Sequence, residues 1–143
     1  SGGTIRNSYV DDEEYIHIKK QGGAVYLEDG TFTMSGGTIK NCSAEQGGAV
    51  YVNSQSGTST FTMTDGEIHS CFATGTFNQS GTLTGIGNGG AVYLNGGTVT
   101  MKGGKIWNNY SENGDGGAVY ISNGKHISGI TTSAVISCQL GIQ

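Results

Sequence analysis

Short runs of alternating hydrophobic and polar residues recur along the chain. In Phe32-Thr33-Met34, Phe61-Thr62-Met63 and Val99-Thr100-Met101, a threonine separates two apolar residues. This period of two is typical of a half-buried β-strand, with the apolar side chains facing the core and the threonines facing outward. Helical periodicity is absent, and glycine at this frequency would cost a helix about 1 kcal/mol per site. The pattern therefore predicts an all-β chain.

A longer repeat organises these runs. Gly-Gly-Ala-Val-Tyr followed by an aliphatic residue occurs four times, starting at Gly22, Gly47, Gly89 and Gly116. A second run follows at residues 30–34, 59–63 and 97–101, and a third at residues 36–41, 65–70 and 103–108. Residues 2–7 are a further copy of the third run, and residues 133–138 are our best match for the last.

Three strand-like runs in each repeat predict a right-handed parallel β-helix. It would be a three-faced solenoid of about four coils, with ~25 residues per coil plus loop insertions. Each strand would pair in parallel with its counterpart one coil away, about 4.8 Å along the axis. We expect residues 1–143 to form a single β-helix domain, an excerpt of a longer repeat protein.

The first run can bury only one of its two alternating sets of side chains. We expect the purely aliphatic columns to face inward, since a buried tyrosine hydroxyl needs a partner. The tyrosines would then form an external stacked ladder, although the opposite choice stays open. The inward columns would be Val25, Val50, Val92 and Val119, and Leu27, Val52, Leu94 and Ile121; the ladder would be Tyr26, Tyr51, Tyr93 and Tyr120.

Glycine and asparagine mark the predicted corners. The Gly-Gly pair requires either a positive φ or a close approach of backbone between coils. Asn7, Asn41 and Asn108 share one position after the third run, where the side chain can hydrogen-bond along the stack and tolerates the bend.

The charge of the chain limits its partners. Charged residues make up 13% of the sequence and the net charge is −4. The seven lysines and arginines are scattered apart from Lys19-Lys20, so no basic stripe is visible along the sequence and we expect no nucleic-acid partner. Since no apolar run approaches ~20 residues, we expect no membrane span in this segment.

The Gly-Gly-Ala-Val runs resemble the Gly-Gly-Ala-[Ile/Leu/Val] motif of polymorphic outer-membrane proteins, the autotransported adhesins of chlamydiae. The longer pattern, in residues 47–52 and 30–42, is also similar to β-helical repeats in large surface proteins of gut bacteria and of some parasitic protists. The resemblance implies a secreted, surface-exposed protein that acts in adhesion, and hence an extracellular or cell-surface location.

Two cysteines occupy the same position in successive repeats. Cys42 and Cys71 each follow the isoleucine of the third run by three residues. Stacked Cα atoms about 4.8 Å apart fall inside the disulfide range, so the two can be neighbours joined by a disulfide, or simply two stacked small residues. Cys138, aligned through Val135, would lie two coils from Cys71 and too far away to bridge.

Acidic residues offer few candidate sites. The cluster of residues 11–14 can be a calcium site but lacks the spacing of known calcium loops, which favours a solvated loop. Asp65 with Glu67, and Glu28 with Asp29, are the carboxylate pairs that a glycan-hydrolysing enzyme would need. Both pairs lie at turns, where such residues are ordinary turn formers. We therefore expect no catalytic residue, no metal and no cofactor.

Insertions collect beside the third run, at residues 8–21, 42–46, 71–88 and 109–115. In a solenoid the face that carries insertions is often the binding face, although such loops can also merely cover the barrel. Aromatic residues among polar neighbours suit contact with a host glycan or protein. The candidate ligand-binding residues are Tyr15, Phe72, Phe77, Trp107 and Tyr110.

These observations favour a non-enzymatic cell-surface or secreted module for adhesion or structural display, which binds glycan or protein through its variable loops. One alternative is a glycan-active enzyme of the polysaccharide lyase or hydrolase kind. Another is a structural filament or spacer subunit whose coils stack on adjacent coils of a larger assembly. Outward Thr-x-Thr columns also resemble ice-binding faces, but irregular coil lengths oppose a lattice match.

Overall fold

A computed structural model describes residues 3–6, 21–122, 127–128 and 135–138. The described residues form strands and turns without a helix, so no helix there could cross a membrane. The strands are β1 (Thr4–Arg6), β2 (Val25–Glu28), β3 (Thr31–Lys40), β4 (Ser43–Ala44), β5 (Val50–Asn53), β6 (Thr60–His69), β7 (Phe72–Ala73), β8 (Thr76–Phe77), β9 (Leu83–Gly85), β10 (Val92–Asn95), β11 (Thr98–Met101), β12 (Lys105–Ser111), β13 (Val119–Ser122), β14 (Ile127–Ser128) and β15 (Val135–Cys138).

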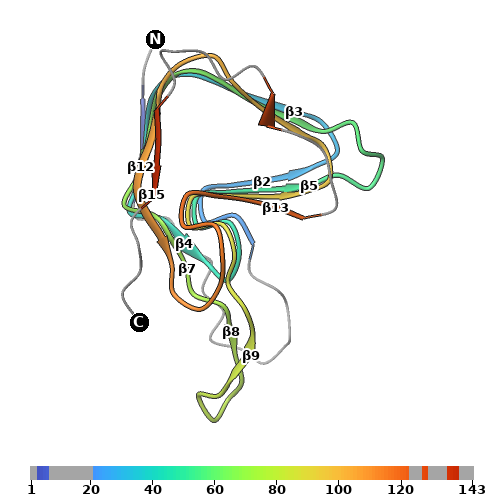
Figure 1. Ribbon diagram of the computed structural model, residues 1–143, viewed down its shortest axis with the longest axis vertical. Helices are drawn as coiled ribbons and strands as arrows, with labels where there is room; N and C mark the ends of the chain where they lie inside the picture. The colour runs from blue at the N-terminus through green and yellow to red at the C-terminus, as the bar shows by residue number, and fades with distance from the viewer. Residues whose placement is uncertain (1–2, 7–20, 123–126, 129–134, 139–143) are drawn as a thin grey trace.

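Equivalent strands of successive repeats pair side by side in parallel. A four-stranded sheet has the order β13-β10-β5-β2, and a larger sheet contains the path β1-β3-β6-β12. The register joins like to like: Val25 pairs with Val50, Val50 with Val92, and Val92 with Val119. Viewed along the shortest axis, the copies lie behind one another around a three-sided outline (Figure 1). The all-β prediction and the parallel pairing of repeats are confirmed.

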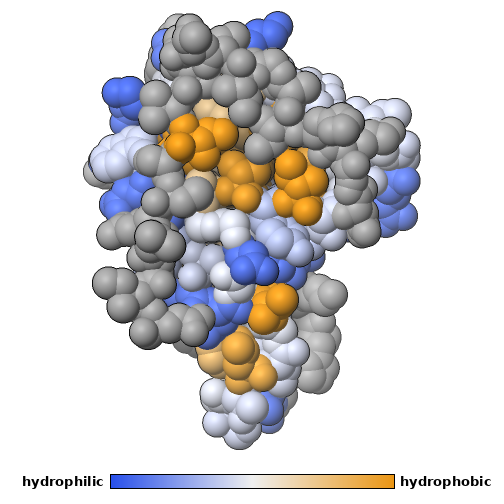
Figure 2. All heavy atoms as spheres, viewed as in Figure 1, coloured by the Kyte–Doolittle hydropathy of each residue, from blue (hydrophilic) through white to orange (hydrophobic). Residues whose placement is uncertain are grey.

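The core lies inside this outline. Figure 2 shows hydrophobic side chains gathered in its interior. Phe61, Met63 and Ile68 are fully buried there, whereas Thr31 and Thr33 of the neighbouring β3 are exposed. The predicted aliphatic columns face inward: the core cluster contains Val50, Val52, Val92 and Leu94, and Val25, Leu27, Val119 and Ile121 pack against it.

The sequence predicted that the second and third runs would form separate strands, but this does not hold in every copy. They merge into the ten-residue strands β3 and β6, and remain apart only as β11 and β12. Within the β3–β6 pair the register shifts on both sides of Ser35. Gly37, with φ +83°, lets the strand bend and shift there without ending.

Two features inside the insertions also differ from the loops that we expected. Short parallel strands β4 and β7 extend the stack just beyond the third run. Within residues 71–88, β8 and β9 form an antiparallel hairpin that projects from the outline (Figure 1).

The Gly-Gly corner uses glycine for both of the expected reasons. The first glycine of each pair has a positive φ, for example +62° at Gly47. The second glycine lies against the next copy: a Cβ at Gly48 would stand 2.2 Å from the carbonyl oxygen of Gly90, and one at Gly90 would stand 2.2 Å from that of Gly117. No side chain fits at such a distance.

The corner after the third run also follows the expectation. Asn41, Ser70 and Asn108 have φ values of +56°, +56° and +51°. Asn108 Nδ2 donates a hydrogen bond to Ser70 Oγ at 3.2 Å, along the stack. Asn7 lies outside the described residues.

The last copy aligns through a different residue from the one that we chose. Ile136, not Val135, pairs with Ile106. A register irregularity then brings Cys138 opposite Asn109, so the copies still follow the expected order.

The corner glycines yield a prediction about stability. Gly90→Ala should lower the free energy of unfolding by more than about 2 kcal/mol, because the new methyl group would collide with backbone that cannot move alone. Gly81→Ala is the control, because no atom lies within 4 Å of the added Cβ; the loss should be smaller there, even though its φ of +78° strains any side chain. Urea unfolding followed by circular dichroism measures both; equal losses would contradict the close approach.

Candidate functional site

A polar face lies on the outer side of β3, β6 and β12. Ile39, Ile68 and Ile106 point into the core from the centres of the third runs, so their sequence neighbours point outward. The register aligns these neighbours in two columns. We call the six residues the outer face: Thr38, Glu67 and Lys105 in one column, and Lys40, His69 and Trp107 in the other.

Trp107 is the largest exposed side chain of the outer face. Its ring stacks on that of His69, with centroids 4.5 Å apart and planes 19° apart. Its Nε1 donates a hydrogen bond to Glu67 Oε2 at 3.4 Å. The side chain is nevertheless 36% exposed, and in β15 the register irregularity leaves no described residue paired with it. The indole is therefore held in one orientation and remains accessible.

The other predicted aromatic residues divide into two places. Phe72 and Tyr110 stack on each other with centroids 5.1 Å apart, and both are partly buried. Burial, and secondarily the charge of Glu112, raise the pKa of Tyr110. Phe77 lies on the projecting hairpin and is 49% exposed, and no ring contact joins it to the aromatic residues that the structure describes. Tyr15 lies outside the described residues.

Exposed apolar side chains gather on the hairpin. Leu83 and Ile86 are exposed beside Phe77, and Figure 2 shows this group as a hydrophobic area over β8 and β9. Of these three residues, the sequence analysis predicted only Phe77 as a candidate for ligand binding.

The four tyrosines of the first run lie in one stack outside the core cluster. Centroids are 5.5 Å apart for Tyr26 and Tyr51, 4.8 Å for Tyr51 and Tyr93, and 5.2 Å for Tyr93 and Tyr120. Only Tyr26, at one end, is strongly exposed, because rings on both sides cover Tyr51 and Tyr93. The ladder lies outside the core cluster, as expected, but its two inner members are buried, which the sequence did not predict.

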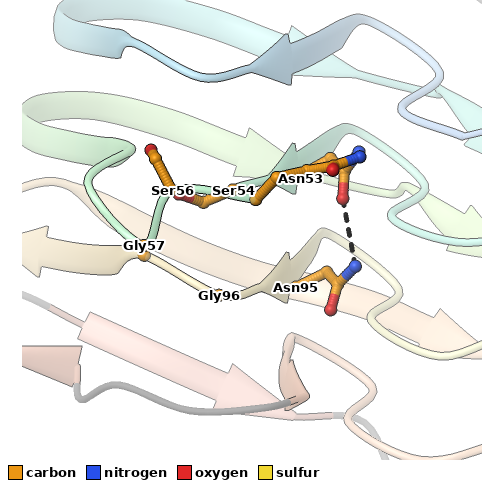
Figure 3. Close-up of a pocket in the computed structure, with 8 residues that line it drawn as sticks. Asn53, Ser54, Ser56, Gly57, Asn95 and Gly96 are labelled. Carbon is orange, nitrogen blue, oxygen red and sulfur yellow. Dashed lines mark hydrogen bonds between the residues drawn. The ribbon is translucent and has the colours of Figure 1, made fainter.

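An open polar groove follows the ends of β5 and β10 (Figure 3). It encloses about 450 Å³ and is lined by residues 53–57 and 95–97. Asn95 Nδ2 donates to Asn53 Oδ1 at 3.0 Å, and Asn53 Nδ2 donates to the Tyr26 hydroxyl at 3.2 Å. These amides bind one another and the end of the tyrosine ladder, and no lining residue carries a charge. The groove was not predicted from the sequence.

Cys42 and Cys71 are both fully buried and carry thiols, so the disulfide that we considered is not formed in this structure. Each Sγ donates instead to the carbonyl oxygen two residues earlier, on Lys40 and His69, at 3.3 Å. A side-chain hydrogen bond with Cys42, together with burial, raises the pKa of the Cys71 thiol. The stacked thiols therefore behave as small apolar core residues.

Asn109 takes the equivalent place in the next copy. Its Oδ1 accepts from the Cys71 backbone N–H at 2.9 Å, and its Nδ2 donates to the carbonyl of Ile68 at 3.1 Å. The buried amide is thus satisfied by the backbone of the preceding copy.

The candidate carboxylates already accept hydrogen bonds from turns or from neighbouring side chains. Asp65 accepts from the backbone N–H of Gly66 at 2.8 Å, and Asp29 accepts from the Ser56 hydroxyl at 2.8 Å. Glu67 accepts from Trp107, as described above. Among the described residues no three His, Cys, Asp or Glu side chains gather as metal ligands would. The acidic residues 11–14 lie outside the described part.

Sequence reasoning selected Trp107 but missed its surroundings. These surroundings come from distant parts of the chain. Lys40, His69 and Lys105 are 29 or more positions from one another, and only the repeat brings them together. The signal was present, because Lys40, His69 and Trp107 hold the same place in three copies of the third run. No protein-family model, curated protein or solved structure matches the chain.

The buried thiols lead to a prediction about reactivity. Cys42 and Cys71 should react with an aromatic disulfide reagent at pH 8 at least about a hundredfold more slowly in the folded protein than in urea, because both thiols are buried and, at Cys71, the raised pKa also disfavours the attacking thiolate. Each site is followed by mass spectrometry of peptides. Rapid modification of both sites in the folded chain would contradict their burial.

The tyrosine ladder leads to a prediction about alkaline pH. Burial, and then the neighbouring Tyr93 and Tyr26, raise the pKa of Tyr51 from 10.0 to about 12. Between these values the unfolded chain releases a proton that the folded chain retains, so the free energy of unfolding should fall as the pH rises from 10 to 12. Urea titrations should show a smaller fall for Tyr51→Phe; an identical fall would contradict the raised pKa.

Proposed function

We propose that the chain is a segment of a right-handed parallel β-helix with three faces. Parallel pairing of repeat-equivalent strands, in register over successive copies, supports this arrangement. Right-handedness is supported by the strong preference of connections between parallel strands of one sheet for that hand. A crystal structure tests the path directly, and a left-handed path would refute it.

We further propose that the chain is a non-enzymatic, extracellular adhesive module that binds glycans, and that its binding site is the outer face. The observation that carries this proposal is the exposed Trp107 ring, which is fixed against His69 beside charged side chains. Repeats similar to these in secreted surface adhesins support the location and the adhesive role.

The chemistry of the outer face suits a sugar. One side of a sugar ring presents C–H groups that pack on an indole, and its edge presents hydroxyls that need hydrogen-bond partners. Lys40, Glu67 and Lys105 supply donors and acceptors around Trp107. The strands fix the spacing of these residues, and the stacking on His69 fixes the indole before binding, which reduces the entropy lost on association.

The occupied carboxylates favour binding over catalysis. Asp65 caps a turn, and Glu67 is engaged by the Trp107 indole, so neither of them is arranged as a proton donor facing a second carboxylate. This is the reason for preferring an adhesive module to a glycan-active enzyme.

Removal of the indole tests the proposal. Trp107→Ala should weaken binding to the glycans that the native chain selects on an array by about thirtyfold, equivalent to about 2 kcal/mol, as for a central aromatic contact. The affinity is measured by isothermal titration calorimetry. Unchanged thermal unfolding would show that the variant keeps its fold.

Phe77→Ala is the matched control. Phe77 is also an exposed aromatic residue, but it belongs to the projecting hairpin and not to the outer face. Its removal should leave glycan affinity unchanged. If Phe77→Ala abolished binding and Trp107→Ala did not, the site would belong to the hairpin and the proposed site would be wrong.

A further inference from the structure

The charges of the described chain are segregated, although the net charge of the whole sequence is −4. Every lysine and arginine among the described residues belongs to the strands β1, β3 and β12 or to the turn that leads into β12: Arg6, Lys40, Lys102 and Lys105. The described acidic residues lie mainly elsewhere, and only Glu67 belongs to the outer face: Glu28, Asp29, Glu45, Asp65, Glu67, Glu112 and Asp115.

The strand register places two of these cations, Arg6 and Lys40, in one column. Arg6 pairs with Lys40, Lys40 with His69, and His69 with Trp107. Adjacent strands are about 4.8 Å apart, so the column repeats at that interval across four strands. Lys105 lies two residues before Trp107 on the same strand and faces Glu67 across the sheet.

The acidic residue of the outer face offsets one of its two lysines, so with His69 neutral the six residues keep a net charge of +1, from Lys40 and Lys105 against Glu67. Glu67 Oε2 accepts the indole N–H of Trp107, so this carboxylate is directed toward the ring. Lys40 and Lys105 are the two permanent cations whose side chains lie on the face, and Arg6 occupies the next register position. The face therefore presents cations beside one accessible aromatic ring.

We propose that the outer face binds an anionic glycan, one that carries a carboxylate or sulfate group at regular intervals along its chain. This inference rests on the proposed function and specifies its ligand class. A sugar ring packs on Trp107, and the acidic groups of neighbouring units meet Lys105 on the same strand and Lys40 farther along the column. Ammonium groups act as point charges on flexible stems and so accept either kind of anion.

A nucleic acid is the other polymer with regular negative charge. Single-stranded nucleic acid is bound by several aromatic side chains on which successive bases stack. The column contains one exposed indole at one end, and its other members are His69, Lys40 and Arg6, which offer no further platform of this kind. These observations favour the glycan.

The test compares polygalacturonate with its carboxyl-reduced form, which has the same backbone without the charge. The native chain should bind polygalacturonate at least about tenfold more tightly, and the preference should decrease at high salt as counterions screen the lysines. The double variant Lys40→Ala/Lys105→Ala should lose this preference and most of the salt dependence. Lys40→Arg/Lys105→Arg, which keeps both charges, should retain both.

The outcomes separate this inference from the function on which it rests. If the alanine double variant bound both polymers as the native chain does, while Trp107→Ala bound neither, the outer face would still be a glycan site but the anionic ligand class would be wrong. Binding of neither polymer by the native chain, together with a glycan array without any hit, would overturn both proposals. Equally tight and lysine-dependent binding of single-stranded DNA would overturn the assignment to a glycan.

Discussion

The fold depends on the contact between a glycine and a carbonyl group of the next copy. At Gly23, Gly48 and Gly90 the backbone of one repeat lies so close to the next that a Cβ would stand 2.2 to 2.3 Å from a carbonyl oxygen. The preceding glycine turns the chain into this contact with a positive φ. Backbone hydrogen bonds such as Gly48 N–H to the Gly89 carbonyl, 3.1 Å long, join the copies at the same place. At this corner the axial spacing is therefore set by backbone atoms alone, with no side chain between the copies.

Because the corner fixes the offset between copies, each later residue of a repeat lies beside its own equivalent. Valine then meets valine in the core, and tyrosine stacks on tyrosine outside it. Burial in this stack, and then the neighbouring Tyr93 and Tyr26, raise the pKa of Tyr51, so the stack opposes the ionisation of that residue at alkaline pH. The same alignment places Asn109 at the position that Cys42 and Cys71 occupy in the earlier copies. There the Asn109 amide hydrogen-bonds to the backbone of the preceding copy.

The repeat made much of this structure predictable. Once the copies were aligned, the pairing partners other than those of the last copy, the inward valines and the corner at Asn41 and Asn108 followed from periodicity and turn chemistry. The merging of runs in β3 and β6 did not follow, because glycines in a strand can either end it or bend it. The β8–β9 hairpin was also missed, since residues 71–88 have no second copy with which to align. The outer face was missed for a third reason: its residues are far apart in the chain and were considered one at a time.

The location of the proposed site follows from the same alignment. Insertions and aromatic residues collect in the loops, yet among the loop aromatics that the structure describes Phe72 and Tyr110 stack on each other and Phe77 alone is strongly exposed. A strand face offers what a loop does not, namely side chains at a fixed interval whose backbone is already ordered by the stack. A ligand with a regular repeat loses less entropy on such a face, and each charge that it carries can meet a charge in register. The copy-to-copy change from Lys40 to His69 to Trp107 then gives one end of the column a ring to pack against and the other end cations. A repeat that keeps its core constant and varies this column would thereby change its ligand without changing its fold.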